Sequence, residues 1–215
     1  MEAKLKIDII QYISSRTPRT FFTLANELLE AAYFQAHQHA MTFDDPEKRR
    51  VLGQLRHYRQ NEALRNAGAQ NGLIAVAAHT APKGERYSLI ASEDIRFGRI
   101  GVPVNNSTPR PSKHRKELSM LNARLEPVNL DLFNQKLLRP SDGLGCLIIT
   151  VNPNPKDQQT APADIKVGVP YTNMRGWHLF EPMSEIIAAY NPAVEIEVQD
   201  LAWVKLKKQL GDSEN

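Results

Sequence analysis

The order of its periodic segments is the feature that most constrains how this 215-residue chain can fold. Three segments with apolar residues at helical spacing come first, over residues 4–15, 20–39 and 44–66. Three strand patterns follow, over residues 72–78, 86–91 and 95–104. Pro82 and Gly84 lie between the first two strand patterns and are typical of a turn. The first half of the chain therefore predicts three helices followed by a β-hairpin.

Strand patterns dominate the second half of the chain. Leu144–Val151 is almost continuously apolar, and alternation of apolar and polar residues predicts further strands over 164–171 and 194–198. Apolar residues at helical spacing predict helices over 116–125, 129–138 and 177–190. The segment 105–116 is polar, basic and rich in proline, which indicates a linker or an exposed loop.

These patterns predict an α+β protein in two parts. Residues 1–104 are expected to form a winged-helix-like basic module of helices and a β-hairpin. After the linker at 105–116, residues 117–210 are expected to form a small α+β domain with a sheet of three or more strands. Residues 211–215 are expected to be a frayed tail.

Charge is divided unevenly between the two parts. Residues 1–116 hold 18 Lys or Arg against 11 Asp or Glu, whereas residues 117–215 hold 9 against 13. A basic region of this size can attract nucleic acid through its phosphates. An alternative interpretation of equal weight is that this basic face is exposed to solvent and binds no partner. The acidic second part is expected to oligomerise, to sense a ligand or to bind a protein.

Composition excludes several classes of protein. No apolar run approaches the roughly 18 residues of a membrane span, and the charged N-terminus does not resemble a signal peptide. The single cysteine, Cys146, excludes an internal disulfide framework and a thiolate zinc cluster within one chain. We therefore expect a cytoplasmic protein with no membrane partner. We expect no cofactor, and no metal site except in the catalytic alternative described below.

The first half is similar to a winged helix-turn-helix in the order of its elements, over residues 5–92. In such modules a cationic helix enters the major groove of DNA and a basic turn in the hairpin contacts the backbone. The resemblance implies nucleic-acid binding by Arg49, Arg50, Arg56, Arg59, Lys83 and Arg86. The densest run of positive residues, in the predicted linker, could also hold phosphates; its members are Arg110, Lys113, Arg115 and Lys116. The leading hypothesis is a non-catalytic nucleic-acid-binding protein, with duplex DNA as the expected ligand.

A second resemblance indicates an alternative, catalytic function. Asp142 precedes one predicted strand, and Asp164 and Lys166 begin the next, which resembles the PD-(D/E)xK nuclease pattern. Alternation along a strand puts Asp164 and Lys166 on one face. Two carboxylates could then hold a divalent cation while the lysine stabilises charge in the transition state. The residues also allow a third hypothesis, a protein-interaction or accessory factor that never touches nucleic acid.

Overall fold

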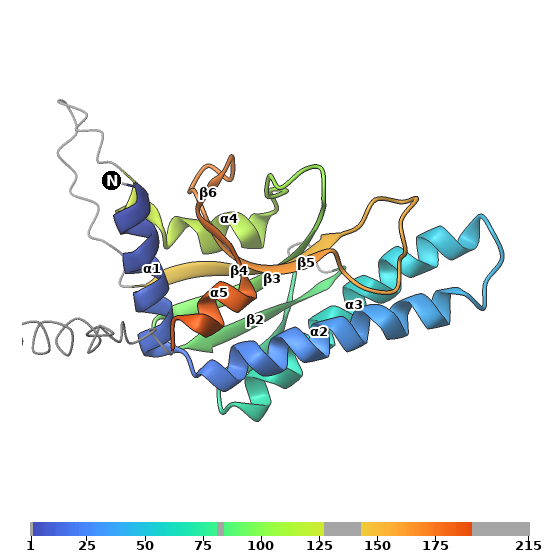
Figure 1. The fold of residues 1–215 in the computed structure, drawn as a ribbon, viewed down its shortest axis with the longest axis horizontal. Coiled ribbons are helices and arrows are strands. Elements are labelled where there is room, and N and C mark those ends of the chain that lie inside the picture. The colour runs from blue at the N-terminus through green and yellow to red at the C-terminus, as the bar shows by residue number, and fades with distance from the viewer. Residues whose placement is uncertain (1, 81–83, 127–142, 191–215) are drawn as a thin grey trace, which may run out of the picture.

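One mixed β-sheet of six strands forms the centre of the protein (Figure 1). The computed structural model describes residues 2–80, 84–126 and 143–190. The strands lie in the sheet in the order in which they occur in the chain. They are β1 (Ile74–His79), β2 (Arg86–Ser92), β3 (Ile95–Pro103), β4 (Leu144–Asn152), β5 (Asp164–Pro170) and β6 (Trp177–Pro182). All neighbouring pairs are antiparallel except β3 and β4, which run parallel. The chain is therefore an α+β protein, as predicted.

Helices cover both faces of this sheet (Figure 1). They are α1 (Glu2–Arg16), α2 (Arg19–Ala40), α3 (Glu47–Gln70), α4 (Lys113–Met120) and α5 (Met183–Ala188), with a short 3₁₀ helix η1 (Ala123–Leu125). Helices α2 and α3 pack along each other as a long antiparallel hairpin on one side of the sheet. Helix α4 lies on the opposite side, against β3 and β4.

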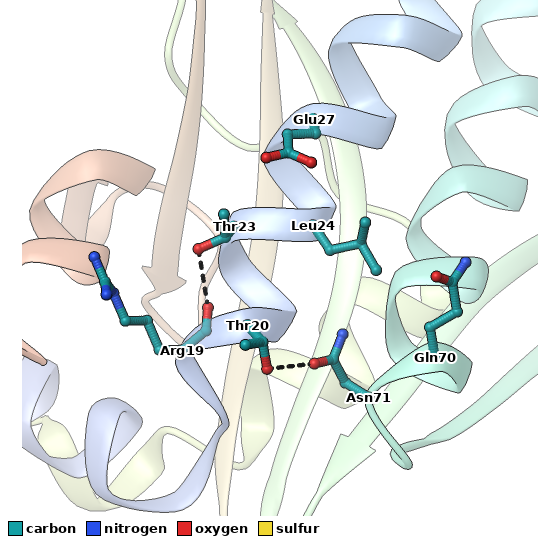
Figure 2. Close-up of a pocket in the computed structure, with 7 residues that line it drawn as sticks. All are labelled: Arg19, Thr20, Thr23, Leu24, Glu27, Gln70 and Asn71. Carbon is teal, nitrogen blue, oxygen red and sulfur yellow. Dashed lines mark hydrogen bonds between the residues drawn. The ribbon is translucent and has the colours of Figure 1, made fainter.

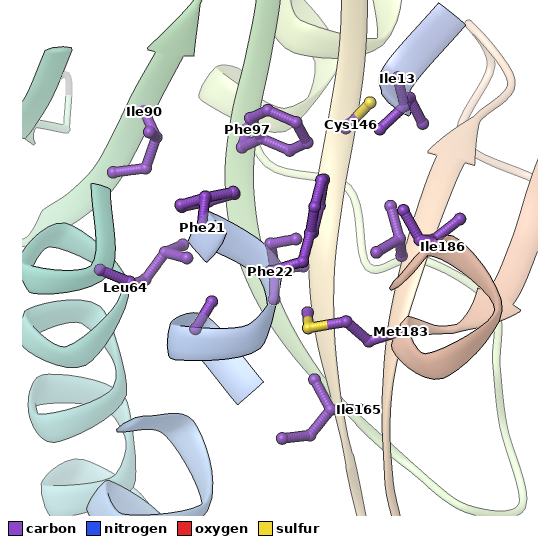
Figure 3. Packing of buried hydrophobic residues seen from close by; sticks show 14 of the residues in the cluster. Ile13, Phe21, Phe22, Leu64, Ile90, Phe97, Cys146, Ile165, Met183 and Ile186 are labelled. Atoms are coloured by element: carbon purple, nitrogen blue, oxygen red, sulfur yellow. The ribbon is translucent and has the colours of Figure 1, made fainter. Parts of the chain in front are cut away.

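Side-chain alternation divides the core into two layers. On the face covered by α1, α2, α3 and α5, aromatic rings meet: the centroids of Phe21 and Phe22 lie 5.4 and 5.8 Å from that of Phe97 (Figure 3). On the α4 face, Leu118 packs with Leu147 and Ile149. Residues 144–151 of β4 are buried throughout, because successive side chains point into opposite layers and both layers are covered. This burial on both faces explains why the sequence of β4 is almost continuously apolar.

Proline and glycine mark the ends of the helical hairpin. Pro18 precedes α2 and Pro46 precedes α3, where a missing backbone N–H costs nothing. Helix α3 continues to Gln70, four residues past the predicted end, and Gly72 then turns the chain into β1 at a φ of 71°. The predicted first two helices, the β-hairpin and the third strand are confirmed.

Other predictions need correction. The helix predicted over 177–190 is wrong in its first part, since residues 177–182 form β6 and only Met183–Ala188 is helical. Pro182 explains the error, because it lacks an N–H and disfavours helical backbone at the residue before it. The predicted linker ends earlier than expected, as Lys113 already begins α4. The predicted helix over 129–138, the strand over 194–198 and the tail at 211–215 lie outside the described residues.

The winged-helix-like module is not confirmed. The helices that would form it make a long hairpin, and its predicted strands belong to the same sheet as those of the second part. Strand β3 pairs with β4 along nine residues, from Ile95 opposite Leu144 to Pro103 opposite Asn152. Strands β4 and β5 match two of the strands predicted in the second part, whereas β6 was not predicted as a strand. Among the described helices, none is long and apolar enough to cross a membrane.

Candidate nucleic-acid interface

The sheet opens between β2 and β3. These strands pair only over Ile90–Ser92 and Ile95–Phe97, although β1 follows β2 as far as Arg86. Helix α3 supplies the missing partners: the Ser88 N–H donates to Oδ1 of Asn61 at 3.3 Å, and the Ser88 hydroxyl donates to the Asn61 carbonyl at 2.7 Å. The first half of β2 thus diverges from β3 without leaving the Ser88 backbone donor unpaired.

A group of positive and imidazole side chains converges near this opening. We call it the basic cluster; its members are His57 on α3, Arg99 on β3, Arg110 in the loop before α4, and His114 and Arg115 on α4. Burial, with a smaller contribution from Arg115, lowers the pKa of Arg99 to about 10. Burial also lowers the pKa of Arg115, and the charge of Arg110 adds to this effect. Each arginine therefore lies within electrostatic reach of the next.

The positive charges of the basic cluster also act on its two histidines. Burial, followed in importance by the charges of Arg115 and His57, lowers the pKa of His114 to about 4. Burial and then Arg99 lower the pKa of His57, against an opposing effect of Glu85, whose carboxylate lies 3.9 Å from His57 Nε2. Among the charges that shift the pKa of His57, Arg99, His114 and Arg115 in the described part of the chain, Glu85 is the one carboxylate. The cluster thus concentrates positive charge with little internal compensation.

The start of α4 adds to this positive potential. Its first four residues are Lys-His-Arg-Lys, its first turn holds no acidic residue, and the cap residue Ser112 makes no capping hydrogen bond with its side chain. The N-terminal end of a helix carries a partial positive charge, so cations there are unfavourable and an anion is favourable. Arg115 Nε donates to the Arg110 carbonyl at 2.8 Å, which ties the preceding loop to the helix. The side chains of Lys113 and Lys116 are exposed beside this contact.

A cavity of about 300 Å³ lies next to the cluster, between α4 and the turn end of the β1–β2 hairpin, where β1 ends and β2 begins. Its lining residues are His79, Thr80, Tyr87, Ser112, Lys113, His114 and Glu117. The rings of Tyr87 and His114 stack in it, with centroids 4.0 Å apart and planes inclined by 12°. Aromatic, cationic, hydroxyl and carboxylate groups therefore line one hollow.

A second cavity, of about 480 Å³, lies between the start of α2 and the end of α3 (Figure 2). The side chains around it include one cation, Arg19, and one carboxylate, Glu27. The Thr20 hydroxyl donates to Oδ1 of Asn71, and the Thr23 hydroxyl donates to the Arg19 carbonyl, so these polar groups are engaged within the protein. This cavity has neither the charge nor the stacked rings of the first one.

The basic residues predicted from the sequence lie in several separate places in the structure. Arg110, Lys113, Arg115 and Lys116 come together at the start of α4, and Arg86 begins the strand that forms the cavity wall. Arg49 and Arg50 are exposed in the first turns of α3, near the tip of the helical hairpin (Figure 1). Lys83 lies outside the described residues.

The two arginines farther along α3 are engaged with other groups. The Arg56 guanidinium lies 3.8 Å from the centroid of the Tyr33 ring and donates to the Gln159 carbonyl at 2.8 Å. Arg59 lies 4.0 Å from the Glu62 carboxylate. Arg56 therefore joins the helical hairpin to the loop after β4.

The residues of the nuclease hypothesis are partly brought together. Asp164 and Lys166 lie on one face of β5, as the alternation predicted, and form an ion pair of 3.1 Å. Asp142 lies outside the described residues. In the part of the chain that the structure describes, no three His, Cys, Asp or Glu side chains are grouped to hold a metal ion.

Sequence reasoning gave no role to Arg99 or Tyr87. Arg99 follows the buried Ile95 and Phe97 on one face of β3, so a cation at this inward position was a signal for a buried charge. Gln60 accepts a hydrogen bond from Arg99, while the buried Arg99 Nε makes none within the described residues and keeps its capacity to donate. Tyr87 carried no comparable signal, because its ring contact joins residues 27 positions apart.

Comparison of the chain with models of protein families, with curated proteins and with solved structures finds no match.

Proposed function

We propose that this protein binds nucleic acid through the basic cluster and the exposed lysines at the start of α4. The observation that supports this most is the concentration of Arg110, Lys113, Arg115 and Lys116 at a helix N-terminus without an acidic cap. Charge repulsion and the helix dipole both oppose this arrangement in the isolated protein. A phosphate relieves both penalties at once, because it brings negative charge and accepts hydrogen bonds.

This proposal differs from the winged-helix hypothesis, in which a recognition helix would enter the major groove of duplex DNA. Arg56, which that hypothesis required, is occupied by Tyr33 and Gln159. The cations at the start of α4 are better placed to meet a ligand, since Arg110, Lys113 and Lys116 are exposed. These cations can contact the phosphate backbone of a nucleic acid. Such contacts give an affinity that depends on salt but not on the base sequence.

The test compares two variants that each lose three exposed positive charges. The first, Arg110→Ala/Lys113→Ala/Lys116→Ala, removes cations at the start of α4. The control, Lys4→Ala/Arg19→Ala/Lys156→Ala, removes the same charge from α1, α2 and the loop after β4. Binding to a labelled oligonucleotide is measured by fluorescence anisotropy at roughly 50 mM salt. We expect the first variant to lose about tenfold or more in affinity and the control to stay within about twofold. Equal losses in both would refute the proposal.

A further inference from the structure

The cavity between α4 and the β1–β2 hairpin adjoins the cations proposed to hold phosphates. Lys113 belongs to both, since it lines the cavity and begins α4, and His114 next to it also lines the cavity. A strand whose phosphates lie along the start of α4 would therefore have its bases within reach of this hollow. The inference drawn from this juxtaposition rests on the proposed function and concerns the form of nucleic acid that binds.

The walls of the cavity suit a planar, polar ring. Tyr87 and His114 both line the hollow, and because each ring covers one face of the other, the outer face of the stacked pair is the surface on which a ligand ring would stack. Because burial keeps the pKa of His114 near 4, its imidazole is neutral at pH 7 and behaves as an aromatic surface. Ser112 and Glu117 add a hydroxyl and a carboxylate that can meet the edge of a base.

A base paired within a duplex cannot enter such a hollow without leaving its stack. An unpaired base can, and stacking on aromatic side chains is the usual way in which proteins bind single strands. From the cavity, the stacked pair and the adjoining cations we infer that the preferred ligand is single-stranded nucleic acid, with an unpaired base held in the cavity beside Tyr87 and His114. This differs from the duplex ligand expected from the sequence.

Three ligands test the inference on the unmodified protein. They are a single strand of about 12 nucleotides, a strand of the same length that lacks its bases, and the duplex of the same sequence. Anisotropy should show the single strand bound about tenfold more tightly than the other two, because only it can stack an unpaired base. Binding of the duplex or of the abasic strand as tight as that of the single strand would overturn the inference and leave the proposed function intact. Absence of binding to all three would overturn both.

Two substitutions of Tyr87 test whether its ring stacks on the bound base. Tyr87→Leu removes the aromatic ring but keeps apolar bulk on β2, whereas Tyr87→Phe keeps the ring. Tyr87→Leu should lose about tenfold in affinity for the normal strand and nothing for the abasic strand. Tyr87→Phe should bind both strands like the unmodified protein. An equal loss for both strands in Tyr87→Leu would contradict a role for this ring in holding a base.

Discussion

Replacement of Asn122 by alanine should strongly destabilise the protein. Asn122 is fully buried between α4 and η1, where its amide donates to the carbonyls of Gly145 at 3.0 Å and Pro170 at 2.9 Å. Its Oδ1 accepts from the Gly145 N–H at 2.8 Å. One side chain therefore fastens the end of α4 to β4 and β5, and with it the cations at the start of the helix.

The size of the effect follows from these three hydrogen bonds. Alanine leaves a backbone N–H and two carbonyls without this partner in the core, and each orphaned group costs about 1–3 kcal/mol. With partial relaxation of the site, we expect the free energy of unfolding to fall by about 3–5 kcal/mol, a large part of the 5–15 kcal/mol typical of whole domains. Urea unfolding followed by circular dichroism measures this change, provided that the slope of the transition is unchanged.

The exposed Asn105 provides a matched control. Its amide makes a single hydrogen bond, to Oδ1 of Asn154 at 2.9 Å, at the surface. Asn105→Ala should change the free energy of unfolding by less than about 0.5 kcal/mol. A loss below about 1 kcal/mol in Asn122→Ala would refute the reasoning, because it would mean that this side chain does not hold α4 to the sheet.

Three further predictions follow from the contacts described above. Arg56→Ala should lower the free energy of unfolding by about 1–2 kcal/mol through loss of its contact with Tyr33, whereas Arg59→Ala should change it by less than about 0.5 kcal/mol. Equal losses of stability in thermal and urea unfolding of the two variants would contradict this prediction. Gly53→Ala should stabilise α3 by about 0.5–1 kcal/mol, since a Cβ there meets no atom within 4 Å, and a lowered Tm would contradict this. Burial lowers the pKa of His114 from 6.5 to about 4, so as the pH falls this side chain is protonated in the unfolded chain before it is protonated in the folded protein. The stability that comes from the neutral His114 is therefore complete above pH 6.5 and is lost as the pH falls toward 4. Urea unfolding between these pH values should show a shallower loss for His114→Asn, and an unchanged pH profile would count against the assignment.

Local patterns in the sequence predicted most of the elements but not their assembly. The helical hairpin and the strands from 72 to 104 carry strong periodicity and clear proline or glycine boundaries. The parallel pairing of β3 with β4 has no local signal, because it joins segments separated by forty residues between Pro103 and Leu144. Without that pairing, the basic, proline-rich composition of residues 105–116 and the change in charge after Lys116 suggested two separate parts.

The candidate interface was predictable only in part, for a related reason. The basic run from Arg110 to Lys116 is visible in the sequence because its members are neighbours in the chain. The contribution of Arg99 and Tyr87 depends on the opening of the sheet between β2 and β3 and on the position of α4 across it. The contact of Arg56 with Tyr33 was not predictable, since a cation on a helix face can pack against an aromatic ring as readily as it can meet phosphate.

The most direct measurement of the central claim is the salt dependence of oligonucleotide binding. Four cations at the start of α4, Arg110, Lys113, Arg115 and Lys116, would displace about four counterions from a single strand, which predicts a slope of log K against log salt of about −3. Between roughly 50 and 200 mM salt the affinity should therefore fall about 50-fold. In Arg110→Ala/Lys113→Ala/Lys116→Ala the slope should shrink to about −1. An unchanged slope in that variant, or no binding by the unmodified protein at the lower salt, would contradict the account.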